Sequence, residues 1–183
     1  MPRTLLVALP MLCGMPLGAL ACWDEVAQRH GVPADLLYAV AKVESGLNPK
    51  AVNRSHIQRT GSVDIGLMQI NSRHLPQLAK RGITESSLFE PCTNLDVGAA
   101  LLADLFVRRG LSWDSVGAYN AACTELKGDD CTRARARYAW KVYRQLPANN
   151  RSARTSRAPT PYRRAAATPS AAATPLLAVR VAP

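Results

Sequence analysis

Residues 33–47 form the stretch that most restricts the fold, because they are apolar at helical spacing and carry a lone carboxylate, Glu44, near their C-terminal end. Leu36, Val40 and Glu44 recur every four residues, so a helix would place them on one face together with Leu37. A proline at the start and a glycine near the end are typical of a first helical position and of a C-terminal cap. The pattern predicts a helix that carries an acidic group toward the core.

This position predicts a raised pKa for Glu44. Burial disfavours the carboxylate anion, and the partial negative charge at a helix C-terminus disfavours it further. A carboxyl group that keeps its proton near neutral pH is what a general acid requires. The helix alone fits a surface glutamate equally well, so the acid hypothesis depends on the rest of the chain.

Three later segments support that hypothesis when they are taken together with the pair Glu44-Ser45. They are G-L-M-Q-I-N at residues 66–71, N-x-x-x-G-A at residues 94–99 and A-Y-N at residues 118–120. In this order the four motifs resemble the lysozyme-like lytic transglycosylases with an SLT domain. These are small cell-wall enzymes that accompany type III and type IV secretion systems, conjugation and type IV pili. The resemblance covers residues 22–146.

The resemblance implies a peptidoglycan substrate and a defined reaction. Glu44 would protonate the bridging oxygen between N-acetylmuramic acid and N-acetylglucosamine. The same carboxylate would then take a proton from the C6 hydroxyl, which closes the muramic acid ring into a 1,6-anhydro product. The sugar's own acetamido group would relieve the positive charge, so one catalytic carboxyl suffices and no cofactor is expected.

The expected substrate-binding residues surround the cleft with amide, hydroxyl and apolar side chains: Ser45, Met68, Gln69, Asn71, Tyr119 and Asn120. Gln69 and Asn71 would hold the sugar substituents. Tyr119 would reach toward the catalytic carboxyl or the acetamido group, and Ser45 would hydrogen-bond near the reacting sugar. Met68 is expected to pack under the cleft.

A second carboxylate leaves another reaction open. Residues 61–72 also resemble the hairpin of animal-type lysozymes, and Asp64 occupies the place of their second catalytic carboxylate. Retaining hydrolysis would need the oxygens of Glu44 and Asp64 about 5 to 5.5 Å apart. Asp64 could instead brace the turn before Gly66 or stabilise charge. We favour the anhydro product, because the G-L-M-Q-I-N and A-Y-N motifs belong to the transglycosylases.

A third hypothesis is a peptidoglycan-binding assembly factor without catalysis. A protein that only binds has no need for a carboxyl group that keeps its proton. The combination of Glu44, Tyr119 and the two amides therefore favours an enzyme.

Both ends of the chain differ from the middle. Arg3 precedes an uncharged stretch that ends in A-L-A, which predicts a signal peptide at residues 1–21 and a periplasmic protein of the cell envelope. An uncleaved anchor is disfavoured by the prolines and glycines of this stretch, so no stable membrane anchor is expected after cleavage. Residues 147–183 contain six arginines and no acidic residue, and their Ala, Pro, Thr and Ser content predicts a disordered basic tail.

The charge of the chain is therefore largely a property of the tail. The net charge of the whole chain is +10, whereas the predicted domain between the ends has 16 basic and 13 acidic residues. No groove-reading or aromatic motif accompanies the basic tail, so a nucleic-acid partner is not expected. We expect a monomer whose partner is peptidoglycan, together with components of a secretion, conjugation or pilus machine.

Four cysteines remain after removal of the signal peptide, and an even number in an exported domain suggests disulfides. Three pairings are open, and pairing by loops favours Cys22 with Cys92 and Cys123 with Cys131. Lipidation of Cys22 is disfavoured by the alanine three positions before it. A zinc site is disfavoured because no C-x-x-C spacing occurs and the three histidines are scattered.

The fold class expected is mainly α, in the α+β lysozyme-like form, with one compact helical domain at residues 22–146. Helices are predicted at residues 23–30, 33–47, 95–109 with Asn94 as cap, from Ser112 onward, and 132–146. In the last of these, Tyr138, Val142 and Leu146 form one apolar stripe. The polar residues 51–64 predict a loop or small hairpin beside the cleft. The side chains that could line the cleft there are those of Asn53, Arg54, His56 and Arg59.

Overall fold

The computed structural model describes residues 18–148, which form a mainly helical domain with one small sheet, and this confirms the predicted fold class. The elements are α1 (Gly18–His30), α2 (Ala34–Ser45), β1 (Val52–Asn53), α3 (Ile57–Thr60), β2 (Asp64–Ile65), β3 (Ile70–Asn71), η1 (Ser72–His74), α4 (Leu75–Ala79), η2 (Ser86–Phe89), α5 (Pro91–Arg109), α6 (Trp113–Asn120) and α7 (Gly128–Tyr143). The predicted tail, apart from its first two residues, and most of the predicted signal peptide lie outside the described residues. The predicted cleavage site after Ala21 falls within the first turn of α1.

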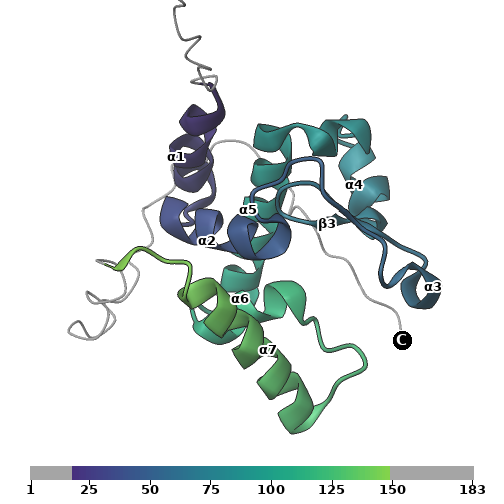
Figure 1. Ribbon diagram of the computed structural model, residues 1–183, viewed down its shortest axis with the longest axis vertical. Helices are drawn as coiled ribbons and strands as arrows, with labels where there is room; N and C mark the ends of the chain where they lie inside the picture. The colour runs from purple at the N-terminus through teal and green to yellow at the C-terminus, as the bar shows by residue number, and fades with distance from the viewer. Residues whose placement is uncertain (1–17, 149–183) are drawn as a thin grey trace, which may run out of the picture.

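Helix α5 is the element around which the others are arranged (Figure 1). It packs against α1, α6, η2 and β3, and it buries Leu95 and Leu102 completely. Gly98 lets the segment before β3 approach this helix, because a Cβ at Gly98 would lie 2.7 Å from the side chain of Met68. The core therefore joins the helical part of the domain to the small sheet.

Helix α2 follows the predicted pattern closely. Leu36, Leu37 and Val40 are buried on one face. The helix ends at Ser45, and Gly46 adopts the left-handed conformation with a φ of 64° that its predicted role as a cap requires. This ending places Glu44 in the last turn, at the boundary between the core and the surface.

The loop or small hairpin expected at residues 51–64 is the first part of a three-stranded antiparallel sheet in the order β1-β2-β3, whose third strand lies beyond it at Ile70–Asn71. Its register pairs Asn53 with Asp64 and Asp64 with Asn71. Residues paired in this way lie side by side on the same face of a sheet. In Figure 1 this sheet and α3 lie on the opposite side of α5 from α1.

The prediction that Asn94 caps α5 is wrong. The helix begins at Pro91, because a proline is well suited to the first helical position, and this leaves Asn94 inside the helix. The side chain is fully buried and makes three hydrogen bonds to backbone atoms of other segments. Its amide nitrogen donates to the carbonyls of Ile65 (2.9 Å) and Leu88 (2.7 Å), and its oxygen accepts from the backbone N–H of Met68 (2.7 Å).

Helix α7 begins at Gly128, four residues earlier than predicted. Its apolar stripe is as predicted, because Tyr138, Val142 and the following Leu146 are buried. The helix packs closely on α6 at Gly117, where a Cβ would lie only 2.5 Å from the carbonyl oxygen of Arg135.

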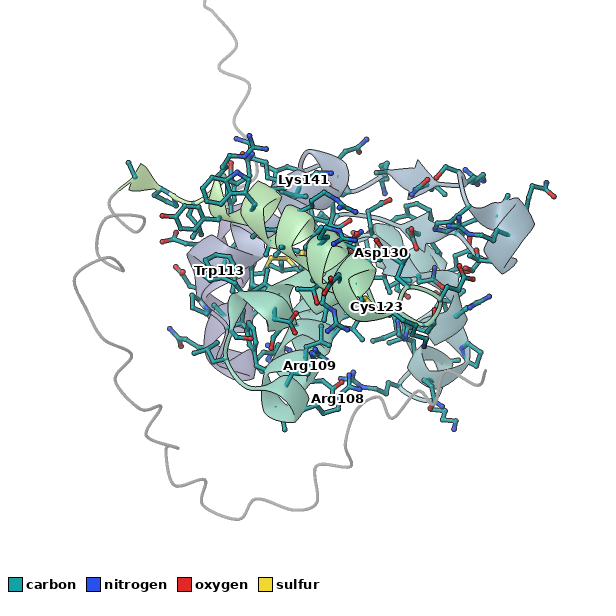
Figure 2. The ribbon with its side chains drawn as sticks, turned by 90° about the horizontal axis from the view of Figure 1, so that it is seen from below. Arg108, Arg109, Trp113, Cys123, Asp130 and Lys141 are labelled. Carbon is teal, nitrogen blue, oxygen red and sulfur yellow. A yellow bond between two sulfur atoms is a disulfide. The ribbon has the colours of Figure 1, made fainter. Side chains whose placement is uncertain are left out.

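Two disulfide bonds stabilise the domain, and they join the pairs that the sequence suggested. Cys22 in α1 is bonded to Cys92 in α5 across 70 residues, and Cys123 to Cys131 across eight. Figure 2 shows Cys123 beside the first turns of α7, near Asp130. The second bond therefore fastens the connection between α6 and α7.

Within residues 18–148, no helix combines the length and the apolar character needed to cross a membrane. The same part of the chain contains no group of His, Cys, Asp and Glu side chains arranged to hold a metal ion.

Candidate active site

A cleft of about 980 Å³ runs between the sheet and the helices. Glu44 reaches it from α2, Asp64 and Asn71 from the sheet, and Tyr119 from α6. On the α5 side the cleft is lined by Leu101 and Leu105 and by the polar residues near the end of the helix. The cleft thus brings together residues from the E-S, G-L-M-Q-I-N and A-Y-N motifs, which are far apart in the sequence.

Glu44 has the electrostatic character of an acid. Its pKa is raised to about 7, mainly because burial disfavours the anion. The negative charge of Asp64 raises this pKa further, whereas a hydrogen bond from Tyr138 and the positive charge of Lys141 lower it. The direction agrees with the prediction from the helix pattern, and it leaves the carboxyl group able to donate and accept a proton near neutral pH.

The tyrosine that contacts Glu44 is Tyr138, whereas Tyr119 was expected to reach toward either Glu44 or the acetamido group of the sugar. The hydroxyl of Tyr138 donates a hydrogen bond to Oε1 of Glu44. The hydroxyl of Tyr119 instead donates to the carbonyl oxygen of Met68 at 3.0 Å. Burial and the negative charge of Glu44 raise the pKa of both phenols, so both remain hydrogen-bond donors. Tyr119 still lines the cleft and lies close enough to Glu44 to respond to its charge.

Asp64 is held by neighbours on each of its oxygens. Asn71 donates to Oδ1 at 2.7 Å and His56 binds Oδ2 at 2.7 Å, while Asn53 lies 3.5 Å from Oδ2. Asn71 is itself fixed, because its amide nitrogen also donates to Ser62 and its oxygen accepts from the backbone of Arg73. Asp64 is therefore an oriented carboxylate in the same cleft as Glu44.

Gln69 lines the cleft from an unusual backbone conformation. Its φ is 50°, in the left-handed region, where a residue other than glycine costs roughly 1 kcal/mol or more. The side chain stabilises this turn by donating to the carbonyl oxygen of Gly66 at 2.8 Å. Such strain is concentrated at functional sites, where the surrounding structure enforces it.

Two predicted substrate-binding residues do not reach the cleft. The hydroxyl of Ser45 donates to the carbonyl oxygen of Leu67 at 2.7 Å, and so it joins α2 to the G-L-M-Q-I-N segment. The side chain of Met68 is fully buried and packs against Gly98, as expected for packing but not for binding. Both residues follow or precede a cleft residue in sequence, and neighbouring side chains point in different directions.

The remaining predictions divide between the cleft and the surface. The cleft is lined by the exposed side chains of Asn53, Arg59 and Asn120 and by the half-buried His56, whereas Arg54 is exposed and is not part of the lining.

Several other residues in the cleft were not indicated by any sequence motif, including Arg73, His74, Arg108 and Arg109. Figure 2 shows Arg108 and Arg109 at the end of α5, and these two form ion pairs with Asp104 and Asp114, respectively. Burial lowers the pKa of His74. The positions of these four residues in the cleft follow from the tertiary fold, and none of the four belongs to a sequence motif.

The sequence matches one protein family and is similar to several known proteins. The family described as "Transglycosylase SLT domain" matches residues 21–139. The invasion protein IagB of Salmonella typhi is 42% identical over 126 residues, which cover 68% of this chain and 76% of IagB. Protein IpgF of Shigella flexneri is 39% identical over 137 residues, which cover 74% of this chain and 86% of IpgF.

The fold is also similar to a solved structure. The X-ray structure of an inactive mutant of the lytic transglycosylase Slt from Pseudomonas aeruginosa superposes with a TM-score of 0.54 at 19% sequence identity. The similarity covers 71% of this chain but only 23% of the Slt chain. At this level of identity the comparison supports the fold and not the details of the site.

Proposed function

The chain belongs to the transglycosylase SLT family and is a lytic transglycosylase that acts on peptidoglycan, and from that premise we propose that it is exported and forms 1,6-anhydro products. The observation that carries the proposal is the raised pKa of Glu44, to about 7, in a cleft lined by three of the family motifs. A group with this pKa is protonated in a large fraction of molecules at neutral pH and can serve as both acid and base.

The reaction uses Glu44 twice. The protonated carboxyl donates its proton to the bridging oxygen as the bond to the anomeric carbon of the muramic acid breaks. The resulting carboxylate removes the proton from the C6 hydroxyl, whose oxygen attacks the anomeric carbon and closes the anhydro ring. Water is not consumed. Glu44 ends the cycle protonated, so it is ready for the next bond.

The surrounding residues orient the acid and the sugars. Tyr138 holds Oε1 of Glu44, which fixes the direction of the carboxyl group. Tyr119 stabilises the turn at Met68 and presents its ring to the cleft, while Gln69 and Asn120 supply amides for sugar substituents. Asn71 contributes mainly through Asp64, because its amide nitrogen donates to Oδ1 of that residue. The negative charge of Asp64 stabilises the positively charged transition state.

Retaining hydrolysis by Glu44 and Asp64 is the second candidate. The observation in its favour is that Asp64 lines the same cleft and that its charge raises the pKa of Glu44. Both carboxyl groups would then take part in bond cleavage, with Asp64 forming a covalent intermediate that water releases.

The location and the domain limits form part of the proposal. We assign residues 1–21 to a signal peptide, 22–146 to the catalytic domain and 147–183 to a basic tail. Two disulfide bonds favour a compartment outside the reducing cytoplasm, which is also where peptidoglycan lies. Similarity to IagB, whose name is that of an invasion protein, supports a role in opening the wall for a secretion apparatus.

Mass spectrometry of the muropeptides released from purified sacculi tests the chemistry. Anhydro ends are lighter than hydrolysed ends by one water, and we expect anhydro ends from the wild-type protein. Release of hydrolysed ends alone would establish the second candidate in place of the first. Glu44→Gln, which is nearly isosteric, is the matched control: it should bind sacculi and release no muropeptides. Equal rates for the variant and the wild type would refute the assignment of the acid.

A further inference from the structure

We propose that His56 is a positioning residue for the reaction and that it acts by fixing the carboxylate of Asp64 in the cleft. This inference rests on the proposed function, in which Asp64 stabilises the positive charge of the transition state. His56 lies eight residues before Asp64, and its Nε2 is 2.7 Å from Oδ2 of Asp64. The side chains are only 18% and 19% exposed, and both line the cleft.

The hydrogen bond from His56 means that each carboxylate oxygen of Asp64 has a donor. Asn71 holds Oδ1 from the neighbouring strand, because the sheet register places it directly beside Asp64. A carboxylate held on only one oxygen can still rotate about the bond to its Cβ. With a donor on each oxygen, the plane of the group is fixed and the remaining acceptor positions stay available to the cleft.

The imidazole of His56 is also held in place. Its Nδ1 lies 3.2 Å from the hydroxyl of Thr60, one helical turn later. An ionised carboxylate can only accept, so Nε2 must carry the proton that binds Asp64. Nδ1 then faces the hydroxyl of Thr60, which keeps the ring in the orientation that binds Asp64.

The short helix α3 places this pair. His56 immediately precedes the helix, Thr60 ends it, and Gly61 closes it in the left-handed conformation with a φ of 64°. The hydroxyl of Thr60 also contacts the carbonyl oxygens of His56 and Ser62. The helix has no buried residue of its own. Within the described part of the chain, its evident contribution is to place Thr60 against the imidazole of His56, which binds Asp64.

The chain contains a matched control for this pair. His30 in α1 binds Asp96 in α5 through Nε2 at 2.8 Å, with side-chain exposures of 12% and 19%. The two histidine–aspartate pairs thus have similar nitrogen–oxygen distances and burial, and Asp96, like Asp64, has a second donor, here Arg29 at 2.7 Å, but neither His30 nor Asp96 lines the cleft. Replacement of His30 reports the structural effect of losing such a bond without any effect on Asp64.

The first experiment compares kcat and KM on purified peptidoglycan for His56→Leu, His56→Gln and His30→Leu. We expect His56→Leu to lower kcat roughly 10- to 100-fold with little change in KM, since misplaced groups reduce the chemical step. His56→Gln, whose amide can donate to Asp64, should recover most of the activity. His30→Leu should leave kcat unchanged. Wild-type kcat in His56→Leu, or equal losses in His56→Leu and His56→Gln, would overturn the proposal.

The second experiment tests whether His56 acts through Asp64. In the background of Asp64→Asn, His56→Leu should reduce kcat further by less than about twofold, because coupled residues give non-additive losses. A full additional loss would overturn the proposal. Should Asp64→Asn leave no measurable turnover, the contrast between His56→Gln and His56→Leu decides alone. Thermal unfolding checks that each variant folds, and His56→Ala replaces His56→Leu if that variant does not.

The outcomes are separable from those of the proposed function. Activity in Glu44→Gln would refute the assignment of the acid, whatever His56 does. Loss of activity in Glu44→Gln together with wild-type kcat in His56→Leu would refute only the positioning role.

Discussion

The hydroxyl of Tyr138 donates a hydrogen bond to Oε1 of Glu44, which lies 94 residues earlier in the chain. The acid at the end of α2 is therefore oriented by a residue of the last helix of the domain. The same bond lowers the pKa of Glu44, and it acts against the larger effect of burial. Tyr138 thus affects both the direction and the proton affinity of the acid.

Tyr138→Phe should lower kcat roughly 10- to 100-fold, because Glu44 loses the donor that orients it. It should also raise the pKa of Glu44, since the lost hydrogen bond favours the anion. A pH–rate profile measures both effects, and the alkaline limb should move upward. Tyr143→Phe is the control, because Tyr143 packs against Trp113 and Trp140 and not against Glu44. An unchanged alkaline limb in Tyr138→Phe would contradict the assigned role.

The activity of the wild-type protein should fall as the pH rises through about 7, the pKa of Glu44, because the acid loses its proton. Two variants should move the alkaline limb of the pH–rate profile in opposite directions. Lys141→Met removes a positive charge and should move it upward, whereas Asp64→Asn removes a negative charge and should move it downward. Profiles of kcat/KM for the three proteins check the prediction, and shifts of the same sign would count against it.

Glu44 should also make stability depend on pH. Its pKa is about 7 in the folded state against an ordinary value of 4.5, so the stabilisation that it gives is complete below about pH 4.5 and is lost as the pH rises through 7. The loss is at most about 3 kcal/mol. Glu44→Gln does not titrate, so it should become more stable than the wild type at pH 8. Urea unfolding at pH 5 and pH 8 measures the difference, and a constant difference would exclude this linkage.

Asn94→Ala should destabilise the domain by about 3 to 5 kcal/mol, because it leaves buried backbone groups of Met68, Ile65 and Leu88 without their partner. Urea unfolding measures the free energy. Asn120→Ala is the control, since Asn120 is exposed and should change stability by less than about 0.5 kcal/mol. Similar losses in the two variants would show that the buried amide has no special role.

The two disulfide bonds should contribute unequally to stability. In the loop-entropy description, a bond that closes 70 residues contributes about 4 kcal/mol and one that closes eight contributes about 2.5 kcal/mol. The double variants Cys22→Ser/Cys92→Ser and Cys123→Ser/Cys131→Ser should therefore both unfold at lower temperatures, the first more than the second. Calorimetry checks the order, and the reverse order would show that strain or residual structure dominates.

The sequence predicted the helices and Glu44 because their signals are local. Spacing of three and four residues defines the buried face of α2, and Gly46 ends it. The first residue of α5 was missed because Asn94 is a favourable cap in isolation, whereas its actual partners lie six to 29 residues away. Sequence patterns describe the face of a helix well and describe long-range polar partners poorly.

The same limit explains the errors within the site. Tyr138 belongs to an apolar stripe, so its ring was correctly predicted to be buried, but the stripe gives no information on the partner of its hydroxyl. The A-Y-N motif suggested that Tyr119 reaches toward Glu44 or the acetamido group of the sugar, and in the fold its hydroxyl binds the backbone of Met68. Ser45 follows Glu44 directly, yet it points to the backbone of Leu67. The motifs indicated that Tyr119 and Ser45 lie near the site, but only the folded structure shows which atoms they contact.

The close packing at Gly117 has a consequence for the acid on another helix. A methyl group there would meet the carbonyl oxygen of Arg135 in α7, three residues before Tyr138. Because a helix shifts as a rigid body over one turn, the displacement would be transmitted to the phenol that binds Glu44. The absence of a side chain at Gly117 thus helps to keep the hydroxyl of Tyr138 within hydrogen-bonding distance of the catalytic carboxyl group.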